Sequence, residues 1–171
     1  PRARLSRWLS TDACDFADAE HDAWRRLPDP VGHRRRVLFV KRGFWLIVDD
    51  LSGAAEHEIE LRYQLASMAV SLQAPWTRAA TPDGRGLWIR VFAEAPPRTA
   101  LVEGGLSPAL GWISEAYGRR RPAPMLIHAF TAPLPLRIVT LLYPTEDASH
   151  AAPVVRALHD AAGRPAGVVF A

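Results

Sequence analysis

The stretch from His33 to Ala66 constrains the fold of this chain more than any other part of the sequence. Two apolar runs, Val37–Val40 and Phe44–Val48, flank the short connection Lys41–Gly43, whose glycine can take the positive φ that such hairpins need. The next segment, Glu56–Leu65, alternates between polar and mostly apolar side chains. The stretch therefore predicts three consecutive antiparallel strands, the third with one face buried and one face in water.

The connection also fixes which residues of the first two strands face each other. If Val40 faces Phe44, then Arg35 lies opposite Asp49, and His33 is a diagonal neighbour of Asp49 on the same face. Diagonal neighbours are about 7–8 Å apart at the backbone, a distance that long or paired side chains can bridge. The sequence thus predicts that His33, Arg35 and Asp49 lie close together.

Composition extends this prediction to the whole chain. With 171 residues, 49% of them hydrophobic and 23% charged, the chain fits a single domain over residues 1–171 with a full core. Fifteen prolines and eleven glycines are spread throughout, which favours many short strands and turns over helices. About ten or more strands with turns every ~8–12 residues predict an all-β fold, a two-layer antiparallel β-sandwich. A closed barrel is the alternative.

The remaining predicted strands are short and are bounded by turn residues. They are Arg4–Leu9, Cys14–Glu20, Val70–Gln73, Trp76–Thr81, Leu87–Phe92, Thr99–Glu103, the pair Met125–Thr131 and Arg137–Tyr143, and the pair Val154–Leu158 and Ala166–Phe170. Between them, Leu106–Pro124 has too few apolar residues in register for a helix or a strand. Unstructured connections longer than ~12–15 residues are usually functional or disordered, and the aromatic residues Trp112 and Tyr117 favour an ordered loop.

Charge restricts the partners. The net charge is only +3, but arginines cluster at Arg34–Arg36 and Arg119–Arg121. Guanidinium groups suit carboxylates, sulfates and phosphates, so an acidic polymer is a natural partner, and solvated strand ends and loops explain the clusters equally well. No nucleic-acid-binding motif is present. The sequence has no apolar stretch of membrane-spanning length and no signal peptide at its start.

Several short motifs resemble the C-terminal sandwich region of the heparinase II/III-like proteins. In order they are the basic strand His33–Arg36, the aromatic-apolar strand Trp45–Asp50, the turn Ser52-Gly53, the strand that begins at Glu56-His57, and Gly111–Ser114, Tyr117-Gly118 and Pro122–Pro124, the last three typical of a bacterial subgroup. The resemblance extends from about Asp18 to the end of the chain, and it rests on the order and spacing of the motifs.

This resemblance implies a C-terminal fragment of a longer polysaccharide lyase, one that acts on uronic-acid-containing acidic polysaccharides such as glycosaminoglycans. In β-elimination a base removes the C5 proton of the uronate and an acid protonates the leaving glycosidic oxygen. The relatives supply most of these groups from an N-terminal helical toroid domain, so the fragment alone is expected to be inactive. If the full-length protein carries a signal peptide, its expected compartment is the bacterial periplasm or the exterior.

The resemblance also implies a metal. Some relatives hold one with a histidine at the start of a strand, an aspartate at the end of the next strand and a later histidine, which makes His33 and Asp49 candidate zinc ligands. At the later position this chain has Gln64, a poor zinc ligand, and His57 is the only local substitute. A buried His33–Asp49 hydrogen bond or an Arg35–Asp49 ion pair is the alternative to zinc.

Other functional candidates are less defined. Tyr117 beside Arg119, Arg120 and Arg121 is the candidate substrate site, with a sugar platform and a carboxylate clamp; a turn held by Trp112 and the nearby prolines is the alternative. No catalytic residue is assigned.

Two further classes of function stay open at this stage. The first is a glycan-binding or purely structural sandwich without catalytic activity, which an upstream reading frame of helical pattern would argue against. The second is a metal-dependent cupin-like enzyme, which would need two more ligands close to His33.

His128, within the predicted strand Met125–Thr131, is expected to be an ordinary strand residue.

Overall fold

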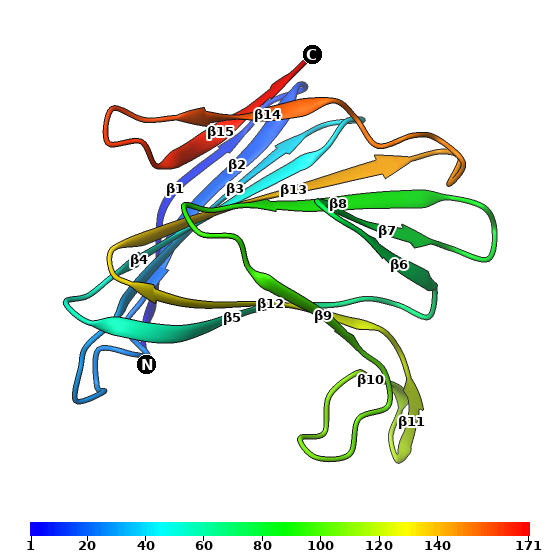
Figure 1. The fold of residues 1–171 in the computed structure, drawn as a ribbon, viewed down its shortest axis with the longest axis horizontal. Helices are drawn as coiled ribbons and strands as arrows, with labels where there is room; N and C mark the ends of the chain where they lie inside the picture. The colour runs from blue at the N-terminus through cyan, green and yellow to red at the C-terminus, as the bar shows by residue number, and fades with distance from the viewer.

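Fifteen strands and no helix make up the computed structural model, which describes all of residues 1–171 (Figure 1). The strands are β1 (Ala3–Ser10), β2 (Cys14–His21), β3 (Gly32–Val40), β4 (Trp45–Ser52), β5 (Glu56–Gln64), β6 (Ala69–Gln73), β7 (Trp76–Ala80), β8 (Gly86–Phe92), β9 (Arg98–Val102), β10 (Trp112–Ala116), β11 (Arg119–Pro122), β12 (Met125–Pro133), β13 (Leu136–Thr145), β14 (Val155–His159) and β15 (Pro165–Phe170). All strand pairs are antiparallel, and no helix is available to span a membrane.

The strands form a sandwich with an added hairpin. The large sheet has eight strands in the order β1-β2-β3-β4-β13-β8-β7-β6, and the small sheet has three in the order β5-β12-β9. Hydrophobic side chains fill the space between the two sheets, while the β14–β15 hairpin lies against the other face of the large sheet (Figure 1). The predicted all-β sandwich is therefore confirmed.

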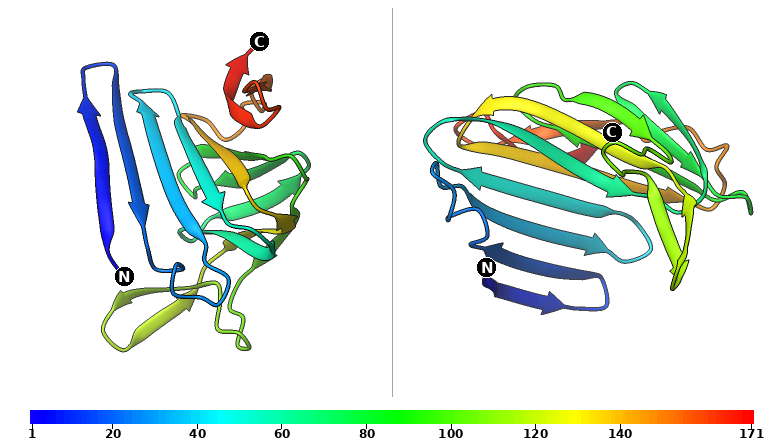
Figure 2. Two further views of the ribbon diagram at one scale, coloured as in Figure 1. Left: turned by 90° about the vertical axis from the view of Figure 1, so that its left-hand side faces the viewer. Right: turned by 90° about the horizontal axis from the view of Figure 1, so that it is seen from below.

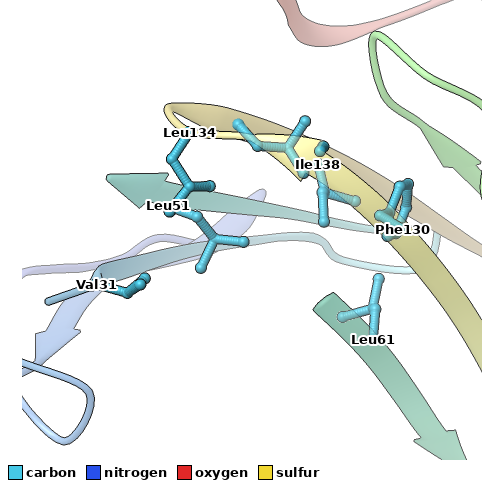
Figure 3. Close-up of a cluster of buried hydrophobic side chains, with 8 residues drawn as sticks. Val31, Leu51, Leu61, Phe130, Leu134 and Ile138 are labelled. Atoms are coloured by element: carbon cyan, nitrogen blue, oxygen red, sulfur yellow. The ribbon is translucent and has the colours of Figure 1, made fainter. Parts of the chain in front are cut away.

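Three clusters of buried side chains hold these layers together. Two lie between the sheets: Val31, Leu51, Leu61, Phe130, Ala132, Leu134, Leu136 and Ile138 form one (Figure 3), and Leu65, Ala79, Ile89 and Leu126 form the other. The third lies under the hairpin and contains Val48, Trp76, Trp88, Phe92, Val139, Leu141 and Val155. Because β13 alternates its side chains, it supplies apolar groups to both faces of the large sheet.

The predicted central hairpin and its register are confirmed. Strands β3 and β4 pair with Arg35 opposite Asp49, and the Val40 and Gly43 amides close the turn by hydrogen bonds of 2.9 Å to the Phe44 and Val40 carbonyls. The positive φ falls on Arg42, at 62°, rather than on Gly43.

Two predicted strand neighbours are wrong. The third strand of the stretch, β5, alternates as expected but pairs with β12 in the small sheet rather than extending the β3–β4 hairpin. Likewise β12 and β13 do not pair, because the chain crosses between the sheets through Pro133–Pro135. Between β4 and β5, where the chain first passes from the large sheet to the small one, Gly53 packs closely on Leu134: a Cβ at residue 53 would lie 2.8 Å from Leu134 Cδ1, so Leu134 would have to shift.

The predicted loop Leu106–Pro124 is also partly wrong, because it contains the β10–β11 hairpin. Positive φ values of 72° at Gly111 and Gly118 allow the turns that begin and divide it. None of the residues in these two strands is buried, and the register shifts within the pair. A hairpin that projects into solvent needs no apolar alternation, which is why the sequence pattern did not reveal it.

Candidate functional site

A chain of polar side chains crosses three neighbouring strands at one end of the large sheet. His21 at the end of β2 lies directly opposite His33 near the start of β3, and their nearest nitrogens, His21 Nε2 and His33 Nδ1, are 2.9 Å apart. His33 Nε2 lies 2.6 Å from Asp49 Oδ1 on β4. The structure therefore brings His33 and Asp49 together as predicted and adds His21.

The backbone fixes the direction of these hydrogen bonds. The Ala23 amide donates to His21 Nδ1 at 3.2 Å, so His21 carries its proton on Nε2 when neutral and donates it to His33 Nδ1. His33 then carries its proton on Nε2 and donates it to Asp49 Oδ1. All four ring nitrogens of His21 and His33 therefore have hydrogen-bond partners, and this row of hydrogen bonds ends on the Asp49 carboxylate.

Asp49 is also held by an arginine. Arg35 donates from Nε to Oδ1 at 2.7 Å and from Nη2 to Oδ2 at 3.1 Å, a two-point contact with both carboxylate oxygens. Burial on its own would raise the pKa of Asp49, but the hydrogen bonds from His33 and Arg35 outweigh burial and keep that pKa below its ordinary value. Asp49 is therefore an ionised carboxylate in a buried site, compensated by Arg35.

Two aromatic residues border this cluster. Trp24 stacks on the His33 ring with centroids 5.2 Å apart and an angle of 21°, and 41% of Trp24 is exposed. Tyr63 approaches Asp49 and Arg35 from β5, and burial raises the pKa of Tyr63 to about 12. The cluster thus has a closed inner side and an aromatic outer side that solvent can reach.

The residues present do not fit a zinc ion. Zinc needs unprotonated nitrogen or oxygen donors, usually four in tetrahedral geometry, yet the lone pairs of His21 and His33 accept hydrogen bonds and both Asp49 oxygens face Arg35. No group of three or more His, Cys, Asp or Glu side chains in the chain is placed to hold a metal.

The two other residues considered as a third ligand are engaged elsewhere. The Gln64 side chain donates to the carbonyls of Leu65 and Pro124, each at 3.1 Å. His57 Nε2 lies 2.7 Å from Asp29 Oδ2. Both alternatives to zinc, the His33–Asp49 hydrogen bond and the Arg35–Asp49 ion pair, are present in the structure. The zinc suggested by the resemblance is left to elemental analysis.

The predicted substrate residues lie elsewhere, on the β10–β11 hairpin. Tyr117 is fully exposed at its turn, Arg120 lies over the Trp112 ring at 4.3 Å from the centroid, and Arg121 donates from Nε to Glu115 at 2.8 Å. In Figure 1 the β2–β3 connection lies at the lower left, whereas this hairpin projects downward to the right of centre. The structure therefore does not bring the two predicted sites together.

Sequence reasoning missed His21 and Trp24. The signal was available, because His21 falls opposite His33 once Cys14–His21 is paired with β3. The first strands carried only a weak pattern, since β1 is exposed along its whole length and lies beyond the area that the small sheet covers (Figure 2). Without a partner for β2, no spacing in the sequence connects His21 to Asp49.

No curated protein matches. Among solved structures, a heparinase III is 20% identical with a TM-score of 0.77 and covers 93% of this chain, and the heparan sulfate lyase HepC from Pedobacter heparinus is 17% identical with a TM-score of 0.78 and covers 99%. The chain spans only 24% and 28% of those two proteins, respectively.

These structural matches show a shared fold. The family evidence comes from the sequence, because the family described as heparinase II/III-like, C-terminal matches residues 2–152, which is most of the chain. The chain therefore belongs to the heparinase II/III-like C-terminal family.

Proposed function

We propose that this chain is the β-sandwich domain of a polysaccharide lyase that acts on uronic-acid-containing acidic polysaccharides by β-elimination. The match of residues 2–152 to the heparinase II/III-like C-terminal family carries the proposal. The similar solved structures include proteins described as heparinase III and heparan sulfate lyase, and each is about four times longer than this chain. The experiment that tests the proposal compares turnover by the isolated chain with turnover by a longer protein that contains it.

Within this proposal, the catalytic acid and base come from an N-terminal helical toroid domain. A general base needs a free lone pair near the proton that it removes, but the His21 lone pair faces the Ala23 amide and the His33 lone pair faces His21. Burial first, and the nearby His33 second, lower the pKa of His21, so its ring is neutral and hydrogen-bonded at neutral pH. The hydrogen-bonded side chains of His21, His33 and Asp49 therefore hold neighbouring residues in place and do not exchange protons with the substrate.

The residue that these side chains hold in place is Trp24. The indole is fixed on one face by His33 and at its edge by His21, with ring centroids 5.2 and 4.9 Å away. An exposed aromatic ring held rigidly in this way suits the apolar face of a sugar. In the proposed lyase, Trp24 orients the polysaccharide, and arginines of this domain attract its carboxylates.

The β10–β11 hairpin supplies the long-range part of this attraction. We expect replacement of Arg119, Arg120 and Arg121 together by glutamine to weaken binding of a uronate polymer several-fold, while Arg156→Gln, another exposed arginine, has little effect. Exposed charges are screened over about 10 Å at 0.1 M salt, so the difference should shrink as salt rises. Titration of heparin-like and alginate polymers at two salt concentrations measures both effects; equal losses in the two variants would contradict this role for the hairpin.

Whether the protein binds zinc can be tested directly. We expect the protein purified without chelator to carry no stoichiometric zinc, because Arg35 already neutralises Asp49 and each histidine nitrogen is hydrogen-bonded. Elemental analysis measures this, with His33→Ala as the matched variant. Zinc at one equivalent in the original protein and none in His33→Ala would restore the zinc prediction.

A glycan-binding or structural sandwich without catalytic activity is the second candidate function. The observation that favours it is the closed hydrogen-bond chain, which leaves this cluster without a free base. A gene that encodes no helical domain upstream of Pro1 would support this second candidate.

A further inference from the structure

A second polar site lies far along the sheet from His33, beside the β14–β15 hairpin. A cavity of about 450 Å³ opens there, within the ~300–1,000 Å³ typical of ligand pockets. Trp76, Arg90 and Phe92 of β7 and β8 line one side, and Thr99 and His128 of the small sheet line another. The hairpin contributes Ala157, His159 and Pro165. We call this cavity the hairpin cleft.

Arg90 of β8 is a half-buried arginine whose guanidinium packs on two aromatic rings. Its guanidinium carbon lies 4.6 Å from the centroid of the Phe92 ring and 5.5 Å from that of Trp76. Nη1 donates to the Val155 carbonyl at 3.2 Å, and this is the only hydrogen bond that the side chain makes.

Most other arginines in the central strands of this sheet have a carboxylate partner. The exception is Arg78 of β7, which donates to the Ala148 carbonyl and does not line the cleft. Arg34, Arg35, Arg36 and Arg137 each pair with an aspartate, whereas no carboxylate lies within 4.0 Å of Arg90. Burial lowers the pKa of Arg90, yet a guanidinium stays charged in proteins. The cleft therefore holds a partly desolvated cation without a counter-ion.

His128 adds a second unsatisfied group. It is only 4% exposed, its Nδ1 lies 3.0 Å from the Thr99 hydroxyl, and its buried Nε2 has no hydrogen-bond partner. Burial lowers the pKa of His128 to about 4, so the ring is neutral at neutral pH. If the Thr99 hydroxyl donates to Nδ1, then Nε2 carries the proton and can donate it to an acceptor. Buried polar atoms without a partner are uncommon in proteins and call for an explanation such as a missing ligand.

We propose that the hairpin cleft binds the anionic group of an acidic sugar, with the Arg90 guanidinium on the carboxylate or sulfate and with Trp76 and Phe92 as the apolar wall. The anionic character of the ligand follows from the Arg90 guanidinium, which has no counter-ion, and the choice of a sugar rests on the proposed function. The β14–β15 hairpin that closes the cleft lies beyond residue 152, where the family match ends. This site is separate from the His33 cluster and from the β10–β11 hairpin.

The test measures binding directly. Glucuronate, a sulfated glucosamine and glucose are titrated separately into the 171-residue chain, and the NMR signals of the Trp76 indole and the Arg90 side chain are followed. We expect saturable shifts with one or both acidic sugars and none with glucose, which lacks the anion. The stronger of the two acidic sugars identifies whether the cleft prefers carboxylate or sulfate.

Matched variants assign the effect to the cleft. Arg90→Met keeps the length of the side chain and should lower the affinity at least tenfold, while Arg85→Met, at an exposed arginine paired with Asp83, should leave it unchanged. Arg90→Lys retains a charge without the planar fork and should bind with intermediate affinity, which keeps the test valid if Arg90→Met folds poorly. Thermal unfolding of each variant checks the fold.

Three results would overturn the proposal: no shift with either acidic sugar, an equal response to glucose, or unchanged affinity in both Arg90 variants. The outcome is distinguishable from that for the proposed function, because elimination by a longer protein is measured by product formation. Turnover that persists in Arg90→Met leaves the lyase assignment intact while the binding titration decides the role of the cleft.

Discussion

Asp49→Ala is expected to lower the free energy of unfolding by about 3 kcal/mol. Removing one partner of a buried ion pair typically costs ~3–5 kcal/mol because the other charge is left uncompensated. Here the Asp49 side chain is 4% exposed but the Arg35 side chain is 43% exposed, so water can partly solvate the orphaned guanidinium and the lower end of the range applies. His33 also loses the acceptor of its Nε2 proton.

Denaturant unfolding monitored by tryptophan fluorescence measures this change. The matched control is Asp83→Ala, which removes an aspartate from the exposed pair with Arg85 and should leave the midpoint of unfolding nearly unchanged. If the two variants lost similar stability, or if Asp49→Ala were neutral, the cluster of Asp49, Arg35 and His33 would not be the support that we infer.

The second large effect concerns pH. His128 has a folded-state pKa of about 4 against an ordinary value of 6.5, because burial penalises its charged form. The unfolded chain therefore binds this proton at a higher pH than the folded chain does. Stability should fall as pH drops through about 6.5 and continue to fall until about 4, with a total loss on the order of 3 kcal/mol from this residue.

Unfolding experiments at a series of pH values between 7 and 4 test this expectation. His128→Asn, which can keep a hydrogen bond to Thr99, should reduce the dependence, and the part that remains includes His21, whose pKa burial also lowers. His150→Asn at an exposed position should leave the dependence unchanged. Asp49 does not confuse the result, since its folded-state pKa lies below its ordinary value of 3.8 and its contribution is lost only at lower pH. A profile that is unchanged in His128→Asn would contradict the assignment.

The sequence predicted those parts of the fold that depend on local pattern. The β3–β4 register follows from the turn and from the two-residue period of a strand, and it placed Arg35 opposite Asp49 correctly. The same pattern says which face of β5 and β12 is buried but not which strand lies beside them. Strands of both sheets bury one face against the space between the sheets, so the pattern alone allows β5 and β12 in either sheet.

The candidate site also contains residues that the local pattern predicted and residues that it did not. His33 and Asp49 were predicted because they belong to one hairpin, whereas His21 needed the pairing of β2 with β3. The hairpin cleft joins Arg90, His128 and His159, which lie on three different layers. No spacing along the chain connects them, and only the packing of the sheets and the β14–β15 hairpin places them around one cavity.

We propose that this domain supports elimination by a lyase whose acid and base lie on another domain. The measurement that tests it most directly is the absorbance of unsaturated uronate products formed from heparin-like, alginate and glucuronan polymers. The 171-residue chain alone should form none, and the same chain joined to the helical domain of its full-length protein should form them. Turnover by the isolated chain, or none by the joined protein on any of these polymers, would contradict the claim.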